Sequence, residues 1–70
     1  MLRLKELRKE KGLKQKDLAA LIGVKQSAMS DYENEKLLLD QHKIKKLVDA
    51  LNTSADYLLG FTDKKPENNN

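Results

Sequence analysis

Apolar side chains recur three and four positions apart along most of the chain, which is the spacing of one face of an α-helix. Leu18 and Ile22 mark such a face in residues 15–22, and the same spacing continues in residues 26–33. Gly23 stands between the two segments, and glycine ends a helix in a left-handed turn without a steric penalty. The pattern therefore predicts two short helices joined at a glycine turn.

Three further helices are predicted around this pair. Leucines spaced among Lys, Arg and Glu predict a first amphipathic helix over residues 2–11. Asp40 is a suitable N-cap for a fourth helix that runs through Asn52. Ser54 is a suitable N-cap for a fifth helix that ends at Gly60. No run of alternating β-branched residues predicts a strand, so we expect an all-α fold.

The chain ends in a polar stretch. Its 70 residues suit one small domain, which we expect to occupy residues 1–61. Residues 62–70, TDKKPENNN, have no large apolar side chain to bury, which predicts a flexible polar tail. Three adjacent leucines at positions 37–39 cannot all face one core, so at least one is expected at the surface or in an interface.

The composition disfavours several classes of function. The absence of cysteine excludes disulfides and thiolate metal sites, and it suits a cytoplasmic protein. No apolar run approaches the ~18 residues of a membrane span, and the N-terminus lacks the continuous apolar segment of a signal peptide. His42, the only histidine, has no partner for metal binding, so we expect it to face solvent. Because no nucleophile–base pair is evident, we expect neither an enzyme nor a bound cofactor.

Positive charge is concentrated at the N-terminal end of the chain. Residues 1–16 hold seven Lys or Arg and two Glu, a net charge of +5. Residues 17–40 hold two Lys and five Asp or Glu, a net charge of −3, and the whole chain carries +3. A basic N-terminal part favours a polyanionic partner, although the same charges also suit the solvated face of a helix.

Residues 15–33, QKDLAALIGVKQSAMSDYE, resemble the helix-turn-helix of the Cro and phage-repressor proteins, the XRE family, and the resemblance extends from Leu4 to Gly60. The positions that carry it are Gln15, Leu18, Ala19, Gly23, Val24, Met29, Tyr32, Glu33, Asn34 and Lys36. It implies a compact five-helix, lambda-repressor-like DNA-binding domain with the helix-turn-helix at the second and third helices. Such a protein is a sequence-specific transcriptional regulator, here expected to be a repressor that binds a palindromic operator in double-stranded DNA. We expect it to bind as a homodimer through the major groove.

The chain departs from the family pattern at three turns. Lys14 and Lys25 stand where the family usually has a Ser or Thr cap, which costs each helix up to ~1 kcal/mol. Glu35 stands where the family usually has glycine, so we expect either strain or a different turn there. Leu39 stands where the family often has proline.

The outward face of the recognition helix carries the candidate base contacts. They are short or flexible hydrogen-bonding side chains, namely Gln26, Ser27, Ser30 and Asp31. Gln26 can pair with adenine N6 and N7, the serines can donate or accept, and Asp31 can accept from cytosine N4. Asp31 can instead pair with a neighbouring lysine or exclude wrong bases, and the whole face can be an ordinary solvated surface.

The beginning of the second helix is the candidate phosphate site. Free backbone N–H groups and the helix dipole favour an anion there, and in similar proteins the glutamine at the position of Gln15 binds the DNA backbone. Further candidate phosphate contacts, each of which can also simply face solvent, are Lys14, Lys16, Lys25, Asn34 and Lys36. Arg8 and Glu33 match a charged pair that joins the first helix to the recognition helix in the family, so we expect a structural role for them.

Dimerisation is expected to use the fourth and fifth helices, through Leu59, Phe61 or the exposed leucines. An alternative function is also compatible with the resemblance, because some similar domains are protein-interaction modules such as antitoxins or antirepressors. The basic surface would then meet an acidic protein, and the leucines at 37–39 and the acidic middle of the chain favour this reading.

Overall fold

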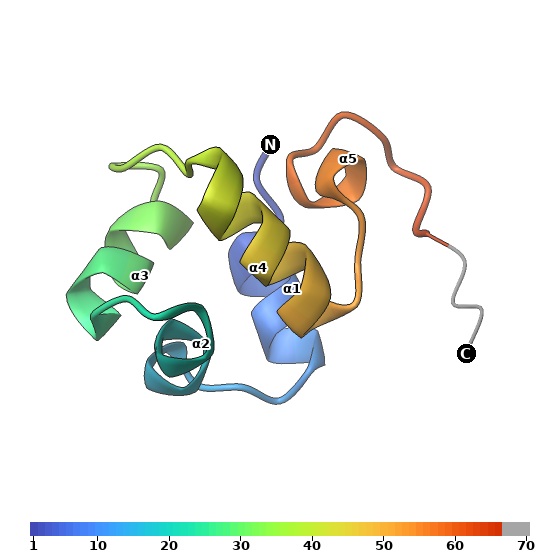
Figure 1. The fold of residues 1–70 in the computed structure, drawn as a ribbon. Coiled ribbons are helices and arrows are strands. Elements are labelled where there is room, and N and C mark those ends of the chain that lie inside the picture. The colour runs from blue at the N-terminus through green and yellow to red at the C-terminus, as the bar shows by residue number, and fades with distance from the viewer. Residues whose placement is uncertain (67–70) are drawn as a thin grey trace.

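Five helices follow one another in the computed structural model, which describes residues 1–66 (Figure 1). They are α1 (Leu4–Glu10), α2 (Gln15–Ile22), α3 (Gln26–Glu33), α4 (Gln41–Leu51) and α5 (Ala55–Leu58). Strands are absent from residues 1–66, and no helix in this range is long and apolar enough to cross a membrane. The prediction of an all-α fold with five helices is confirmed.

Every helix contributes at least one fully buried side chain to a single core. These side chains are Leu4, Leu18, Ile22, Met29, Leu47, Leu51 and Leu58. Helices as short as these are unstable alone, so the core holds them in place. Burying one such leucine stabilises the fold by about 1.5–3 kcal/mol. In Figure 1, α4 crosses in front of α1, with α2 and α3 on one side and α5 on the other.

The first helix is shorter than the sequence predicts. The leucine pattern predicts residues 2–11, whereas α1 spans Leu4–Glu10. The backbone N–H of Arg3 donates to the carbonyl of Leu58 at 2.8 Å, so the chain before Leu4 follows the end of α5 instead of extending the helix. A contact between the two ends of the domain therefore sets where this helix begins.

The side chain of Arg3 also joins the two ends of the domain. Its Nη1 donates to the carbonyls of Tyr57 at 2.7 Å and Thr62 at 2.8 Å, and its Nη2 lies 2.5 Å from the carboxylate of Asp63. The guanidinium carbon lies 4.2 Å from the centroid of the Tyr57 ring, a cation–π distance. The first residues of the predicted tail thus contact the domain, and its last residues, 67–70, lie outside the described range.

The fourth and fifth helices begin at the predicted caps. The carboxylate of Asp40 accepts from the backbone N–H of Lys43 at 2.8 Å, and the hydroxyl of Ser54 accepts from that of Tyr57 at 3.1 Å. Each bond satisfies one of the N–H groups that a helix leaves free in its first turn. Asn52, with φ of 51°, ends α4 in the left-handed conformation.

The loop between α3 and α4 carries a strained residue and the three leucines. Glu35 has φ of 58°, a left-handed conformation that costs a residue other than glycine about 1–2 kcal/mol. Leu38 is 93% exposed and Leu37 is 46% exposed, whereas Leu39 packs against the core. The prediction that at least one of these leucines lies at the surface is confirmed.

Candidate nucleic-acid interface

The turn between α2 and α3 is built on Gly23. Its φ of 75° ends α2 in the left-handed conformation, and the N–H of Val24 then donates to the carbonyl of Ala19 at 2.9 Å. A Cβ added at Gly23 would meet only the Nζ of Lys46, at 3.9 Å. Glycine is therefore favoured here by its backbone conformation and not by crowding.

Buried side chains fix how α2 and α3 present their outer faces. Leu18 and Ile22 of α2 and Met29 of α3 are at most 1% exposed. Tyr32 is only partly buried and packs against the edge of the same cluster. Since the apolar side of α3 is held against α2 in this way, its polar side is turned outward.

The four candidate base contacts lie on that polar side with unequal access. Gln26 and Ser27, at the start of α3, are exposed, whereas Ser30 and Asp31, one turn later, are partly buried. The hydroxyl of Ser30 accepts a long hydrogen bond from Nδ2 of Asn34 at 3.4 Å. The beginning of α3 is therefore the part most open to a partner.

The candidate phosphate contacts surround the same pair of helices. Five of them are exposed, namely Lys14, Lys16, Lys25, Asn34 and Lys36. Gln15, the first residue of α2, is partly buried. The ammonium groups can move freely in solvent, whereas Gln15 is held in place by the fold.

Neither α2 nor α3 has a side-chain cap at its beginning. Their N-cap residues are Lys14 and Lys25, whose ammonium groups can donate hydrogen bonds but cannot accept them. At α2, the carboxylate of Asp17 accepts from the backbone N–H of Lys14 at 3.2 Å, which steadies the N-cap residue itself. Backbone N–H groups in the first turn of each helix thus remain available to an external acceptor.

A polar junction beneath these helices links α1, α2 and α3. The Nε of Arg8 donates to Oε2 of Glu33 at 2.5 Å, and its Nη2 lies 3.3 Å from Oε1. Nη1 of the same arginine donates to the carbonyl of Leu13 at 2.7 Å. The side chains of Arg8 and Glu33 are 9% and 1% exposed, so the pair that the resemblance implies lies in the interior.

The junction includes one contact that the sequence does not reveal. Nε2 of Gln15 donates to Oε1 of Glu33 at 3.0 Å. The two residues are separated by two helices and a turn, and no spacing rule relates them. Only the arrangement of α2 against α3 shows that Glu33 contacts both Arg8 and Gln15.

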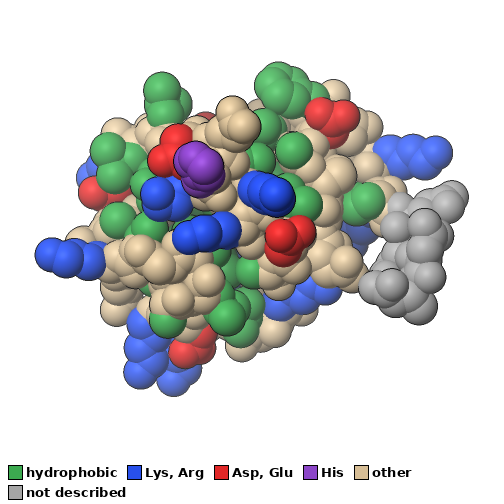
Figure 2. All heavy atoms as spheres, in the orientation of Figure 1, with side chains coloured by type: hydrophobic (Ala, Val, Ile, Leu, Met, Phe, Trp, Pro, Cys, Tyr) green, Lys and Arg blue, Asp and Glu red, His purple; other side chains and the backbone are tan. Residues whose placement is uncertain are grey.

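The start of α4 carries the only histidine of the sequence. His42, near the start of α4, is exposed, and Figure 2 shows it among lysine or arginine side chains and acidic ones. Within residues 1–66, no three His, Cys, Asp or Glu side chains come together as metal ligands would.

Comparison with known proteins places this geometry in context. A family model described as helix-turn-helix matches residues 4–58. No curated protein matches the chain. Among solved structures, the chain is similar to the P22 c2 repressor protein in a crystal structure of its complex with the synthetic operator 9T in the presence of Tl⁺. The sequence identity is 31%, the TM-score is 0.79, and the match covers 84% of this chain and 94% of the repressor chain.

Proposed function

The chain belongs to the helix-turn-helix family, and from this premise we propose that it is a sequence-specific transcriptional regulator that represses by binding operator DNA. The observation that carries the proposal is the polar face of α3, turned outward by the buried Met29 and by the turn at Gly23. The similar P22 c2 repressor, solved with an operator, supports double-stranded DNA as the partner.

The proposed docking places α3 in the major groove and α2 across the DNA backbone. Gln26 and Ser27, exposed at the start of α3, reach base edges first. Gln26 pairs with an adenine through its amide, and Ser27 donates to or accepts from a neighbouring base. Ser30 and Asp31 lie one turn later and contact bases deeper along the helix, where Asp31 accepts from a cytosine amino group.

The phosphate contacts hold the protein in register without reading sequence. Gln15 and the open N-terminus of α2 bind one phosphate, where the helix dipole favours an anion. The exposed Lys14, Lys16 and Lys25 add positive charge around the two helix beginnings. Asn34 and Lys36, just after α3, extend the same contacts along the backbone.

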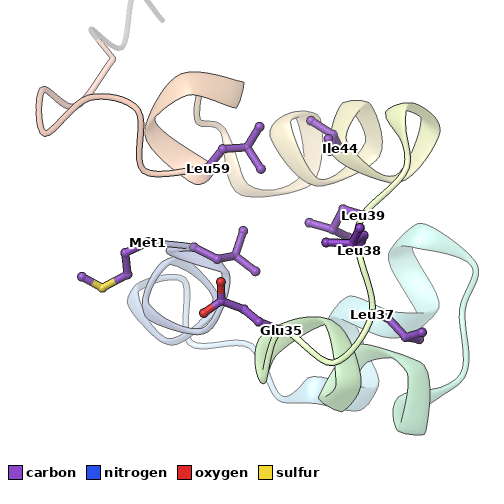
Figure 3. A pocket seen from close by; sticks show the side chains of 8 residues that line it. Met1, Glu35, Leu37, Leu38, Leu39, Ile44 and Leu59 are labelled. Atoms are coloured by element: carbon purple, nitrogen blue, oxygen red, sulfur yellow. The ribbon is translucent and has the colours of Figure 1, made fainter.

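A second copy of this chain is the proposed partner for dimerisation. Beside the exposed Leu38 lies a mainly apolar groove of about 340 Å³, lined in part by Leu39 of the loop, Ile44 of α4 and Leu59, the residue after α5 (Figure 3). A protruding leucine next to an apolar hollow is self-complementary, as a twofold interface requires. Because the groove begins in the loop directly after α3, pairing there links the two recognition helices on a palindromic operator.

Substitution of Leu38 tests the dimer. Leu38→Asp should lower the molecular mass measured by sedimentation from that of a dimer to that of a monomer. It should also abolish the higher affinity for a palindromic duplex than for a single half-site. Leu21→Asp is the matched control, because Leu21 is also an exposed leucine (61%) but does not line the groove. A dimer that persists in Leu38→Asp, or dissociates equally in both variants, would contradict this interface.

Substitution of Gln26 tests base recognition. After an operator has been selected from random duplexes, Gln26→Ala should weaken operator binding by about 1–3 kcal/mol and relax preference at one position. Lys36→Ala should instead weaken binding to operator and random DNA alike and reduce the salt slope by about 1. An equal loss on both DNAs for Gln26→Ala would exclude direct readout by this residue. Failure to enrich any shared palindrome would redirect attention to a protein partner.

A further inference from the structure

The buried carboxylate of Glu33 accepts hydrogen bonds from two different helices. Arg8 of α1 approaches both of its oxygens, and Gln15 of α2 donates to Oε1 at 3.0 Å. With 1% of its side chain exposed, Glu33 is out of reach of DNA itself. Any influence it has on binding must act through the residues it holds.

The chemistry of this contact decides which way the amide of Gln15 faces. An ionised carboxylate can only accept hydrogen bonds, so the nitrogen of the Gln15 amide, not its oxygen, faces Glu33. The amide nitrogen has two hydrogens, and one is used by Glu33. The second hydrogen remains for another acceptor, and a phosphate oxygen is also an acceptor only.

The charge of Arg8 makes the arrangement compatible with a phosphate. An uncompensated carboxylate next to the DNA backbone would repel it, and a buried one would be costly to hold. The guanidinium of Arg8 at 2.5 Å neutralises the charge of Glu33 while leaving its oxygens able to accept. The carboxylate can therefore orient the amide with little long-range repulsion of phosphate.

We propose that Glu33 is a positioning residue for phosphate recognition, which fixes the amide of Gln15 with an N–H directed to the DNA backbone. This inference rests on the proposed DNA-binding function. It assigns each residue of the polar junction a distinct role: Arg8 neutralises the charge of Glu33, Glu33 orients the amide of Gln15, and Gln15 donates to the phosphate. Electrostatics alone makes the opposite prediction, because removing a negative charge from a DNA-binding domain should strengthen binding.

The sign of one substitution separates the two explanations. Glu33→Gln should weaken binding to operator and random duplexes alike by roughly tenfold, the scale of one hydrogen bond to a charged group. Glu6→Gln is the matched control, because it removes the same charge from an exposed side chain outside both the polar junction and the proposed dimer groove. The control should bind DNA as tightly as the unmodified protein or more tightly. Equal or tighter binding by Glu33→Gln, measured where circular dichroism shows it folded, would overturn the proposal.

A double-substitution cycle shows whether the effect passes through Gln15. Gln15→Ala alone should weaken binding about as much as Glu33→Gln, and adding Glu33→Gln to Gln15→Ala should weaken it no further. Additive losses would assign Glu33 a role independent of Gln15. If the unmodified protein shows no salt-dependent DNA binding, the proposed function fails; if only the cycle is additive, this inference alone fails.

A measurement on the unmodified protein covers the case in which Glu33→Gln does not fold. In NMR spectra without DNA, a side-chain amide proton of Gln15 should exchange with solvent several-fold more slowly than those of Gln41, which is exposed at the start of α4. Equal exchange rates for the two side chains would show that Glu33 does not hold the amide and would overturn the proposal.

Discussion

The helices of this domain begin in two different ways. α4 and α5 close their own first turns, because Asp40 and Ser54 each accept the backbone N–H three residues later, at 2.8 and 3.1 Å. α2 and α3 have Lys14 and Lys25 as their N-cap residues, and neither side chain accepts a hydrogen bond from the first turn of its helix. α4 and the residue after α5 line the proposed dimer groove, whereas α2 and α3 form the proposed DNA side. α1, whose N-cap is Arg3, also lacks a side-chain cap.

α2 and α3 lack the stability that a side-chain cap would add, but their first-turn N–H groups remain free to bind an external anion. A missing Ser, Thr, Asp or Asn cap typically costs about 0.5–2 kcal/mol. An open first turn keeps its N–H groups and the positive end of its dipole for an external anion, and a lysine beside it adds a full positive charge. Under the proposed function, α2 and α3 receive their missing acceptor from DNA phosphate.

Adding a side-chain cap to α3 should produce the largest change in DNA affinity. Lys25→Asp supplies a cap, which should stabilise the folded protein by about 1 kcal/mol in urea denaturation. The same substitution should weaken DNA binding roughly a hundredfold at low salt, because it occupies the N–H groups and reverses the charge beside them. Titrations of one duplex at several salt concentrations would measure the second effect.

The control for this variant is a charge reversal away from the open helices. Lys45 is exposed on α4 and has no proposed contact with DNA. Lys45→Asp should weaken binding far less than Lys25→Asp and should leave the slope of affinity against salt nearly unchanged. If both reversals weaken binding equally, the loss reflects overall charge, and the open N-terminus of α3 has no special role.

Removing the side-chain cap of α5 should have a smaller effect, and only on the free energy of unfolding. Ser54→Ala removes the acceptor for the N–H of Tyr57 and should cost about 0.5–2 kcal/mol of unfolding free energy. Because α5 is not on the proposed DNA side, the folded variant should bind DNA with unchanged affinity. A change in DNA affinity at a temperature where the variant is fully folded would contradict the claim that the cap of α5 affects stability but not DNA binding.

The local features behind this comparison were predictable from the sequence. Caps, a glycine turn and apolar spacing act within a few residues, so α2 and α3 have the predicted bounds. Asp40 and Ser54 cap the helices that they were expected to cap. Gly23 has the expected left-handed conformation.

The features that the sequence did not predict depend on contacts between distant segments. α1 begins at Leu4 because Arg3 bonds to the end of α5, and nothing near the N-terminus signals this. The bond from Gln15 to Glu33 joins the first residue of α2 to the last residue of α3, so it depends on how the two helices pack together. Local patterns fix each helix, whereas the junction beneath the candidate site follows from how the helices pack.

The smallest expected effect is a dependence of the cap of α4 on pH. The backbone N–H of Lys43 donates to Asp40 and holds the pKa of that carboxyl below its ordinary value of 3.8, with help from the charge of the lysine side chain. Because the folded pKa is the lower one, the ionised cap stabilises the protein fully above pH 3.8. This contribution is lost as the pH falls through the folded pKa.

Asp40→Asn isolates this contribution, because asparagine caps a helix about as well but does not titrate. In thermal unfolding measured against pH, the unmodified protein should be the more stable at neutral pH, and the difference should shrink below pH 3.8. Lys25→Asp should introduce a similar acid-dependent loss at α3, where the unmodified protein has no carboxylate cap. If the stability difference between the unmodified protein and Asp40→Asn stays constant with pH, the negative charge of Asp40 does not contribute to the cap of α4. The contrast with the uncapped α2 and α3 would then reflect hydrogen bonding without charge.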